Sequence, residues 1–384
     1  MKVLHTADWH VGKKLGRIDR SDETRAVLDE LVAVAEREQV DLILVAGDLF
    51  DRALPPFASM GLVLTTLVRL ANTGAPVVAV AGNHDSAELF GVLAPYLAPN
   101  NVTLVSKPLR PEQGGVVTVT ARDGKTRAQI ACFPFLHETH VVEFLDASEE
   151  WFKSYAERVK RISAFYASHM AKSDPGALNF LVGHFMIDGA VPSGSERELH
   201  IGEAYMTTKA AVPSDINYTA LGHIHACQRA PSSSGEAWYA GSLMQLDFGE
   251  AQHEKFCLLV DVTHDRTRVE KQIPITAGRS LRKVSGTIAE LRALADEVGD
   301  DYLDVTVATD GPAPGLADEV RELFAHALNV RADYERVEAE ALNREGMPLD
   351  ELYAAFVREA HGNEPDQDLM GAFNELRREV GVDW

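Results

Sequence analysis

The sequence is poor in cysteine and has no long apolar run. Its 384 residues include three cysteines, Cys132, Cys227 and Cys257, and no two of them have CxxC spacing. A disulfide framework or a thiolate zinc site is therefore not expected, and so few thiols are typical of a reducing cytoplasm. No stretch approaches the roughly 18 apolar residues of a membrane span, and the N-terminus has no signal-peptide pattern. We expect a cytoplasmic protein that does not enter a membrane.

Basic residues are also scarce. The chain has 37 Lys and Arg against 58 Asp and Glu, a formal net charge of −21, which by itself disfavours contact with nucleic acid. The acidic excess is concentrated near the C-terminus. Residues 288–384 hold 24 acidic and 8 basic residues, a net of −16, so residues 1–287 carry only −5. The acidity therefore belongs to the tail and does not exclude an anionic substrate for the rest of the chain.

The first hundred residues alternate between strand and helix patterns. Strands are predicted at 2–7, 41–46 and 76–81, and helices with one apolar face at 23–38 and 57–72. This order predicts a parallel sheet with right-handed crossovers. Later strands are predicted at 128–133, 178–183, 217–222 and 255–262, with a long helix at 146–172. Because turn signals separate some of these strands, we expect a second, antiparallel sheet.

The chain changes character near residue 275. Residues 279–337 predict strand, helix (287–298), strand (302–308), helix (315–328) and strand, and residues 348–384 are helical with a break at 361–365. We therefore expect three parts, at residues 1–275, 276–340 and 345–384. The last part carries apolar stripes with little chain left to bury them, which favours a partner's groove or coiled coil; the stripes consist of Leu352, Phe356, Leu369, Met370, Phe373 and Leu376.

Five predicted strands run through Gly or Ala directly into residue types that bind metals. They are LHTAD (ending in Asp8, with His10 two residues later), LILVAGD (Asp48), VVAVAGN (Asn83), LNFLVGH (His184) and YTALGH (His223, with His225 two residues later). Glycine at such a point lets the backbone turn sharply and leaves room for close approach. Ligands of open α/β sheets bind at the carboxyl ends of strands, so we expect these side chains to converge.

Carboxylate, imidazole and amide oxygen together suit a two-metal hydrolytic centre with Mn²⁺, Fe or Zn²⁺ rather than Ca²⁺. Asp48 lies at the middle strand end and is the candidate for the carboxylate that bridges both ions. We assign one ion to Asp8, His10 and His225, and the other to Asn83, His184 and His223. Two such ions lower the pKa of a bridging water and neutralise charge on phosphoryl oxygens.

His84 directly follows a candidate ligand, and Asp51 lies three residues after Asp48. A histidine held and charged by a carboxylate can donate a proton to a leaving oxygen, as general acid catalysis requires. We therefore expect His84 to act as the acid and Asp51 to orient it. The basic loop that follows His10 contributes Lys13, Lys14 and Arg17, for which contact with DNA phosphates and plain solvent exposure are both open readings.

The motifs DWH, GDLFDR, GNHD, GH and GHIH, in this order, resemble the calcineurin-type metallophosphoesterase superfamily. Three longer stretches resemble its bacterial SbcD branch of nucleases for DNA double-strand-break repair. These are LHTADWHVGK, SERELHIGE at 195–203, and YTALGHIHACQ followed by YAGSLMQLDFGE. The sequence departs from this branch at Ala226, where such sequences often have a basic residue.

The resemblance implies an α/β fold, a four-layer αββα metallophosphoesterase sandwich with a small α+β capping domain and a helical C-terminal tail. Residues 1–275 would be the nuclease domain, 276–340 a DNA-binding cap, and 345–384 the segment that docks on an SbcC-type ATPase. It also implies two divalent ions, Mn²⁺ foremost with Fe, Zn or Mg as alternatives, and exonuclease and endonuclease activity on DNA ends, hairpins and single strands. Family analogy further suggests a homodimer, with residues 57–72 as a candidate interface.

Two other functions fit the same residues. A phosphatase or cyclic-nucleotide phosphodiesterase could use the same centre, although such an enzyme has little need of the long extension after residue 275. A DNA-end scaffold for an ATPase could hold a structural metal only.

Overall fold

The computed structural model describes residues 1–137, 154–196, 205–232, 235–334 and 347–380. The chain divides into two compact units, Met1–Leu281 and Arg282–Trp384. The N-terminal part of the expected helix at 146–172 and the expected border between 340 and 345 lie outside the described residues. Within the described part, no helix is both long and apolar enough to cross a membrane.

The first sheet of the first unit has the strand order β16-β15-β1-β4-β5-β6. Its strands are β1 (Lys2–Thr6), β4 (Leu42–Val45), β5 (Val77–Val80), β6 (Val102–Val105), β15 (Phe256–Val262) and β16 (Thr267–Pro274). The strands β1, β4, β5 and β6 are parallel, as expected from the alternating pattern. The helices α1 (Ser21–Glu38), α2 (Phe57–Asn72) and α3 (Ala87–Leu97) lie between these strands in the chain, whereas β15 and β16 close one edge in antiparallel directions.

The second sheet has the order β13-β14-β12-β9-β8-β7. Its strands are β7 (Val116–Thr120), β8 (Arg127–Phe133), β9 (Leu178–His184), β12 (Tyr218–Gly222), β13 (Gln228–Arg229) and β14 (Ala237–Tyr239). The expectation of an antiparallel sheet is wrong for its centre, because β8, β9, β12 and β14 run parallel. Helix α4 (Tyr155–Ser173) lies between β8 and β9 in the chain. A helical crossover of this kind connects strands that run parallel.

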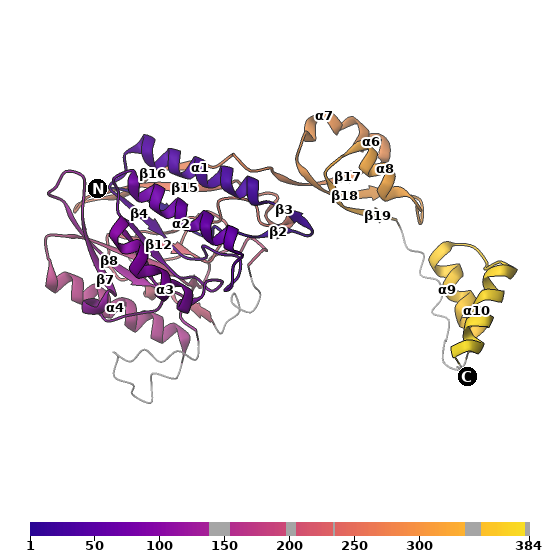
Figure 1. Cartoon of the computed structure of the whole chain (residues 1–384), viewed down its shortest axis with the longest axis horizontal. Helices are drawn as coiled ribbons and strands as arrows, with labels where there is room; N and C mark the ends of the chain where they lie inside the picture. The colour runs from indigo at the N-terminus through magenta and orange to yellow at the C-terminus, as the bar shows by residue number, and fades with distance from the viewer. Residues whose placement is uncertain (138–153, 197–204, 233–234, 335–346, 381–384) are drawn as a thin grey trace. The chain divides into compact units, whose positions relative to one another are not determined.

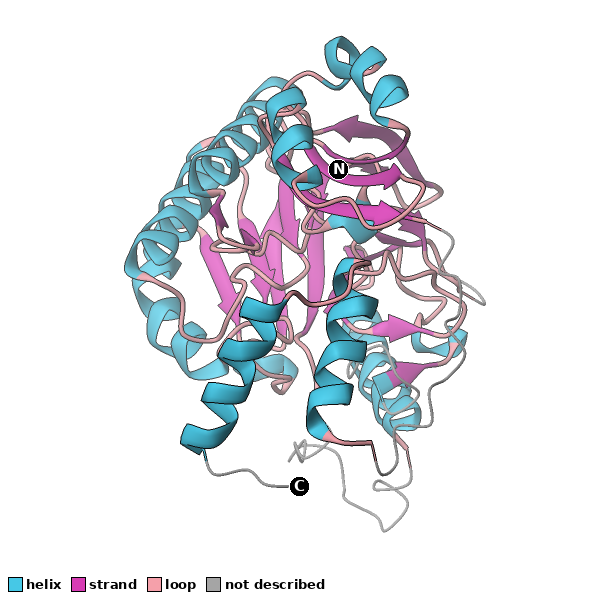
Figure 2. Cartoon of the chain, turned by 90° about the vertical axis from the view of Figure 1, so that its right-hand side faces the viewer, coloured by secondary structure: helices cyan, strands magenta, loops and turns pink. Residues whose placement is uncertain are grey.

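The two sheets face each other and each is covered by helices on its other side. In β4, Leu42 and Leu44 belong to the core between the sheets, while Ile43 and Val45 belong to the core under α1 and α2. A third core packs α4 against the outer face of the second sheet. Since side chains alternate between the faces of a strand, three apolar cores separate four layers in the order αββα, and Figure 2 shows the strands between helices.

A polar contact crosses the core between the sheets. His5 in β1 is fully buried, and its two ring nitrogens lie 2.9 Å from the Tyr218 hydroxyl and 3.2 Å from the Leu221 carbonyl oxygen of β12. Burial lowers the pKa of His5 to about 3, so the ring is neutral. The contact joins the strands that lead to Asp8 and to His223.

The described residues of the first unit also form several short elements. They are the hairpin β2 (Lys14–Leu15) and β3 (Ile18–Asp19), the pair β10 (Met186–Ile187) and β11 (Met206–Thr207), and the 3₁₀ turns η1 (Ala98–Asn100), η2 (Pro111–Gln113), η5 (Lys209–Ala211) and η6 (Phe248–Glu250).

The second unit contains a three-stranded sheet and two helices of the tail. Its elements are β17 (Leu281–Gly286, which begins at the last residue of the first unit), α6 (Ile288–Ala293), α7 (Ala295–Val298), β18 (Tyr302–Ala308), α8 (Leu316–Leu323), β19 (Ala327–Asp333), α9 (Leu349–His361) and α10 (Gln367–Val380). The expected helix at 315–328 is too long, because α8 ends at Leu323, Phe324 is extended and β19 begins at Ala327. Gly362, with φ of 73°, ends α9 where the break was expected.

Gly222 tests how closely the two sheets approach at their carboxyl ends. A Cβ atom at this position would lie 2.0 Å from the Ala46 carbonyl oxygen and 3.0 Å from the Ala7 Cβ. We expect Gly222→Ala to lower the free energy of unfolding by about 1–3 kcal/mol, the usual cost of overpacking. Gly176→Ala is the control, because its Cβ would meet no atom closer than 3.7 Å, and we expect a change within about 0.5 kcal/mol. Urea unfolding measures both, and equal stabilities would contradict the close approach.

Candidate metal centre

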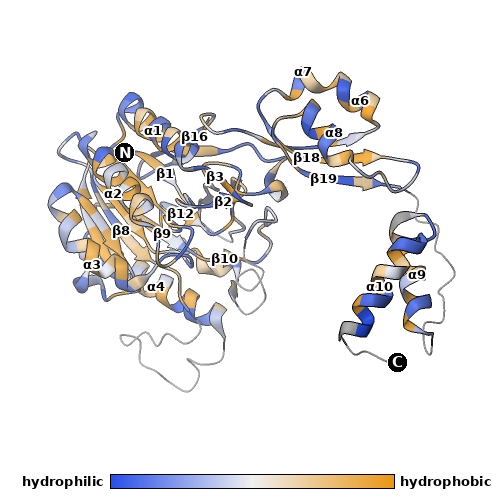
Figure 3. Cartoon of the chain, turned by 45° about the vertical axis from the view of Figure 1, so that its right-hand side comes forward, coloured by the Kyte–Doolittle hydropathy of each residue, from blue (hydrophilic) through white to orange (hydrophobic). Residues whose placement is uncertain are grey.

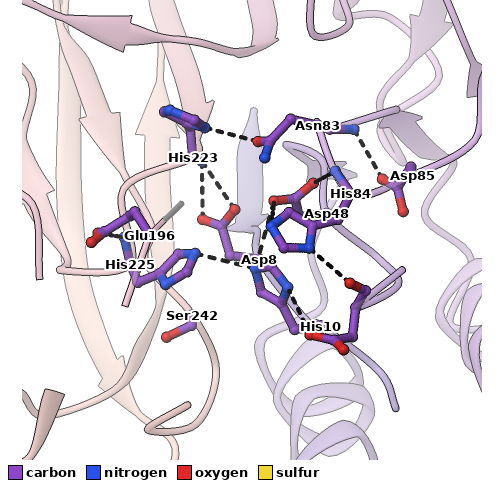
Figure 4. A network of polar contacts seen from close by, with 12 residues as sticks. Asp8, His10, Asp48, Asn83, His84, Asp85, Glu196, His223, His225 and Ser242 are labelled. Atoms are coloured by element: carbon purple, nitrogen blue, oxygen red, sulfur yellow. Dashed lines mark hydrogen bonds and ion pairs between the residues drawn. The ribbon is translucent and has the colours of Figure 1, made fainter. Parts of the chain in front are cut away.

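The candidate ligands meet at the carboxyl ends of strands from both sheets. Asp8 and His10 follow β1, Asp48 follows β4, and Asn83 follows β5, while His184 ends β9 and His223 and His225 follow β12. Figure 4 shows the residues of the first sheet on one side of the cluster and His223 and His225 on the other. All seven side chains are buried or nearly so. The structure therefore brings together residues from five separate strand ends.

The backbone at these strand ends is unusual. Six non-glycine residues of the described chain have positive φ, and four of them are candidate ligands: Asp8 (51°), His10 (44°), Asp48 (51°) and His223 (94°). Such conformations cost of the order of 1–3 kcal/mol each and persist where the surrounding structure holds them. Gly47, with φ of 91°, leaves room for His184, whose Nδ1 would lie 2.2 Å from an added Cβ.

One group of ligand atoms comes from Asp8, His10, Asp48 and His225, and these atoms all lie within 4.8 Å of one another. The Nε2 atoms of His10 and His225 are 3.1 Å apart, and His10 Nε2 is 3.6 Å from Asp48 Oδ2. His10 Nδ1 is buried and has no hydrogen-bond partner among the described residues. Two imidazole nitrogens facing each other beside two carboxylates fit a divalent cation of the Mn²⁺, Fe or Zn²⁺ class.

The second group forms around Asn83. Its Oδ1 lies 2.9 Å from His184 Nε2 and 2.9 Å from His223 Nδ1. His184 Nε2 is in turn 3.4 Å from Asp48 Oδ2. Asp48 therefore lies against both groups, which is the position that a bridging carboxylate needs.

The pKa values of the two aspartates of the cluster are shifted in opposite directions. Burial raises the pKa of Asp8 to about 7, although His184 and His225 oppose this. Burial acts in the same direction on Asp48, but the neighbouring His184 and His84 outweigh it and hold its pKa well below its usual range. The surroundings therefore favour the ionised form of Asp48 more strongly than that of Asp8.

His84 lies beside the cluster, but Asp51 holds it differently from the expectation. His84 Nδ1 is 2.8 Å from the backbone carbonyl oxygen of Asp51, and Nε2 is 4.0 Å from Asp48 Oδ2. The Asp51 carboxylate instead lies 3.6 Å from Lys13 Nζ and 4.0 Å from His10 Nδ1. The main-chain carbonyl of Asp51 thus accepts the hydrogen bond of the His84 ring, and an oxygen of the Asp51 carboxylate lies within 4.8 Å of a ring nitrogen of both His84 and His10.

The basic loop is a short hairpin of β2 and β3 next to these residues. Lys13 pairs with Asp51 as described, Lys14 Nζ is 4.0 Å from Asp19 Oδ2, and Arg17 is exposed. Of these three basic residues, Lys13 is therefore the one that contacts a residue next to the candidate ligands, namely Asp51.

Sequence reasoning missed a carboxylate that joins two ligand loops. Asp85 is buried and accepts hydrogen bonds from the N–H groups of Gly82 (2.9 Å), Phe50 (3.0 Å) and Leu49 (3.2 Å). Burial raises the pKa of Asp85 to about 7. The signal was present in the motif GNHD, whose last residue is Asp85.

Two further buried carboxylates support His225 and were also missed. Glu196 accepts a hydrogen bond of 2.9 Å from the His225 N–H, and Glu250 Oε1 lies 3.1 Å from His225 Nδ1. Both belong to stretches that carried the family resemblance, SERELHIGE and LDFGE, but spacing along the chain does not indicate that they reach His225. Of the first stretch, only Ser195 and Glu196 are among the described residues.

Two parts of the chain match family models. Residues 1–227 match the family model of calcineurin-like phosphoesterases. Residues 277–356 match the model described as the type 5 capsule protein repressor C-terminal domain.

Three curated relatives are named as the SbcD subunit of the nuclease SbcCD. The chain is 27% identical to that of Bacillus subtilis over 391 residues, covering 98% of this chain and 97% of the relative. It is 28% identical to that of Escherichia coli K12 (92% and 90% covered) and 29% identical to that of Rhodobacter capsulatus (68% and 66% covered). A solved dimetal phosphatase from Danio rerio aligns with a TM-score of 0.41 and 14% identity, over 72% of this chain and 99% of that chain.

Asp48 lies against both groups of ligand atoms, so its removal tests whether they form one centre. We expect Asp48→Ala to weaken Mn²⁺ binding at both groups of ligand atoms, measured by calorimetry on the metal-stripped chain. Asp19→Asn is the control, because Asp19 is an exposed carboxylate of the β2–β3 hairpin, and should leave binding unchanged. Two ions bound by Asp48→Ala with unchanged affinity would contradict a shared ligand.

Proposed function

This chain belongs to the calcineurin-like phosphoesterases, and on that premise we propose that it is a cytoplasmic DNA nuclease that acts like the SbcD subunit of SbcCD. The observation that carries the proposal is the convergence of seven candidate ligands, with Asp48 in contact with both groups and His84 beside them. The similarity to the Bacillus subtilis relative extends over 98% of the chain and so includes the second unit. The proposed activities are exonuclease action on duplex ends and endonuclease action on single strands and hairpins.

Two divalent ions are the proposed cofactors, with Mn²⁺ favoured over Fe, Zn and Mg. Asp8, His10 and His225 would hold one ion and Asn83, His184 and His223 the other, with Asp48 between them. When bound, such ions supply a water of lowered pKa and neutralise charge on the phosphoryl oxygens. The buried donor set fits them, because imidazole, amide and carboxylate ligands all point into one small space.

His84 is the proposed general acid. Its Nδ1 donates a hydrogen bond to the Asp51 carbonyl oxygen, so this nitrogen keeps its proton. A protonated ring can then transfer its other proton, from Nε2, to the oxygen that leaves the phosphorus. The position of Nε2, 4.0 Å from Asp48 Oδ2, puts this transfer next to the metals. Lys13, Lys14 and Arg17 would contact backbone phosphates of DNA from the adjoining hairpin.

We propose that the first unit pairs with a second copy through α2 and α3. Large apolar side chains lie exposed at the start of α2 and on α3, with Phe57 at 90%, Leu54 at 85% and Tyr96 at 76% exposure. Large exposed apolar side chains such as these are common at protein interfaces when they gather on one face. The expected candidate at residues 57–72 corresponds to α2, and the exposed residues add α3 to it.

The proposed partner of the helical tail is an SbcC-type ATPase. The rings of Tyr353 and Phe373 stack at 3.9 Å and join α9 to α10. Phe356 and Leu376 remain 59% and 60% exposed, and Figure 3 shows apolar and polar residues on both helices. Such an amphipathic pair is typical of docking on another helix.

Removal of the proposed acid separates catalysis from metal binding. We expect His84→Ala to lower cleavage of linear duplex DNA with Mn²⁺ by about 10²–10⁴-fold while both ions remain bound. His169→Ala, a change at a partly exposed histidine of α4, is the control and should cleave normally. Cleavage by His84→Ala at the wild-type rate would rule out the acid role.

The same assay decides between the functions. Parallel measurements use an aryl phosphodiester and a phosphomonoester. A preference for either over DNA would favour a phosphatase or cyclic phosphodiesterase. No cleavage at full metal occupancy, even with the ATPase added, would favour a scaffold.

A charge on the tail's apolar surface tests the ATPase contact. We expect Leu376→Glu to weaken binding of the SbcC-type ATPase by about tenfold or more, since burying a leucine contributes about 1.5–3 kcal/mol. Asn374→Glu adds the same charge on the opposite side of α10 and should bind normally. Surface plasmon resonance with the immobilised ATPase measures both, and equal affinities would exclude this face.

A further inference from the structure

The ring of His225 is held from both sides. Its Nε2 faces His10 Nε2 at 3.1 Å, inside the first group of ligand atoms. Its Nδ1 faces away from that group, 3.1 Å from Glu250 Oε1 and 2.5 Å from the Ser195 hydroxyl. The ring nitrogen that points away from the other ligand atoms therefore meets the carboxylate of Glu250.

Glu250 has no exposed surface, and both of its carboxylate oxygens are used. Oε2 lies 2.5 Å from Lys255 Nζ and accepts hydrogen bonds from the Ser242 hydroxyl (3.1 Å) and the Leu246 N–H (3.2 Å). Oε1 lies against His225 and accepts a hydrogen bond from the Ser195 hydroxyl. The carboxylate is thus fixed by contacts on its far side, and its remaining oxygen is directed at the imidazole.

Lys255 keeps this carboxylate charged. A buried carboxylate is costly unless a cation and hydrogen bonds compensate it, and the Lys255 ammonium is itself buried. Lys255 also donates to the His225 carbonyl oxygen (3.1 Å) and the Ser242 hydroxyl (2.8 Å). Glu250 therefore holds the side chain of His225, and Lys255 holds its main chain.

We propose that Glu250 is the positioning residue of the metal centre, which holds the proton of His225 on Nδ1 and directs the lone pair of Nε2 at the ion. A carboxylate that accepts the second N–H of a ligating histidine sets its tautomer, orients the ring and makes it a stronger ligand. This inference rests on the proposed function, because it assigns His225 to one of the two metal ions. Glu250 meets His225, which belongs to the group of Asp8 and His10, so its effect falls on the ion of that group and spares the ion of Asn83.

Mn²⁺ titration of the metal-stripped full chain by calorimetry tests the assignment. Glu250→Gln keeps the shape of the side chain and removes its charge. We expect it to lower the affinity for one of the two Mn²⁺ ions by about 10–100-fold, while the affinity for the other ion stays unchanged. Asp247→Asn is the matched control. Asp247 lies in the same loop and accepts a hydrogen bond from the Gly249 N–H, a role that asparagine retains, so both ions should bind as in the wild type.

A second variant covers the case in which Glu250→Gln does not fold. Glu250→Asp keeps the charge beside Lys255 but moves the carboxylate away from His225. It should lower the affinity for the same Mn²⁺ ion by a smaller factor. Thermal unfolding of the metal-free chain reports on the loop itself. If the folded variants lower the melting temperature yet bind both ions with wild-type affinity, Glu250 is only structural and the inference is overturned.

The two proposals fail in different ways. A wild-type chain that binds two Mn²⁺ ions but cleaves no DNA refutes the nuclease and leaves the role of Glu250 intact. Unchanged Mn²⁺ affinities in Glu250→Asp or in folded Glu250→Gln refute the role of Glu250 and leave the nuclease intact.

Discussion

The buried carboxylate of Asp48 is the group on which the rest of the structure depends. Its Oδ1 accepts a hydrogen bond of 2.8 Å from the His84 N–H, and its Oδ2 lies 3.4 Å from His184 Nε2. Asp8 acts in the same way toward the second sheet, where it accepts the His223 N–H at 3.0 Å. The two aspartates thus accept hydrogen bonds from the backbone of neighbouring loops and also belong to the candidate ligand cluster, so charge and fold are coupled at one point.

Three buried carboxylates around this centre each hold a different segment that carries candidate ligands. Asp85 joins the loops after β4 and β5, Glu196 accepts the backbone N–H of His225, and Glu250 meets its ring. Asp85 thereby stabilises the residues that directly follow Asp48, whose φ of 51° is otherwise unfavourable. A rigid site of this kind reduces the reorganisation that catalysis would otherwise require.

The two sheets make this centre possible because their carboxyl ends meet. Glycines at the strand ends allow the approach, as at Gly222 against Ala46, and the buried His5–Tyr218 contact joins β1 to β12 across the core. Helices on both outer faces bury the remaining apolar surface. The acidic second unit needs no part in holding the ligands, since all of them belong to residues 1–281.

The sequence alone determined where the strands end and which residue types stand there, because periodicity and glycines are local properties. The parallel first sheet and the break after α9 followed from the same signals. The direction of the central strands in the second sheet did not, because it depends on how α4 and the later crossovers return the chain. The tertiary structure also decided that Asp51 uses its carbonyl toward His84 and that Glu250, 25 residues after His225, reaches its ring. Such contacts depend on loop paths and side-chain directions, which no spacing along the chain records.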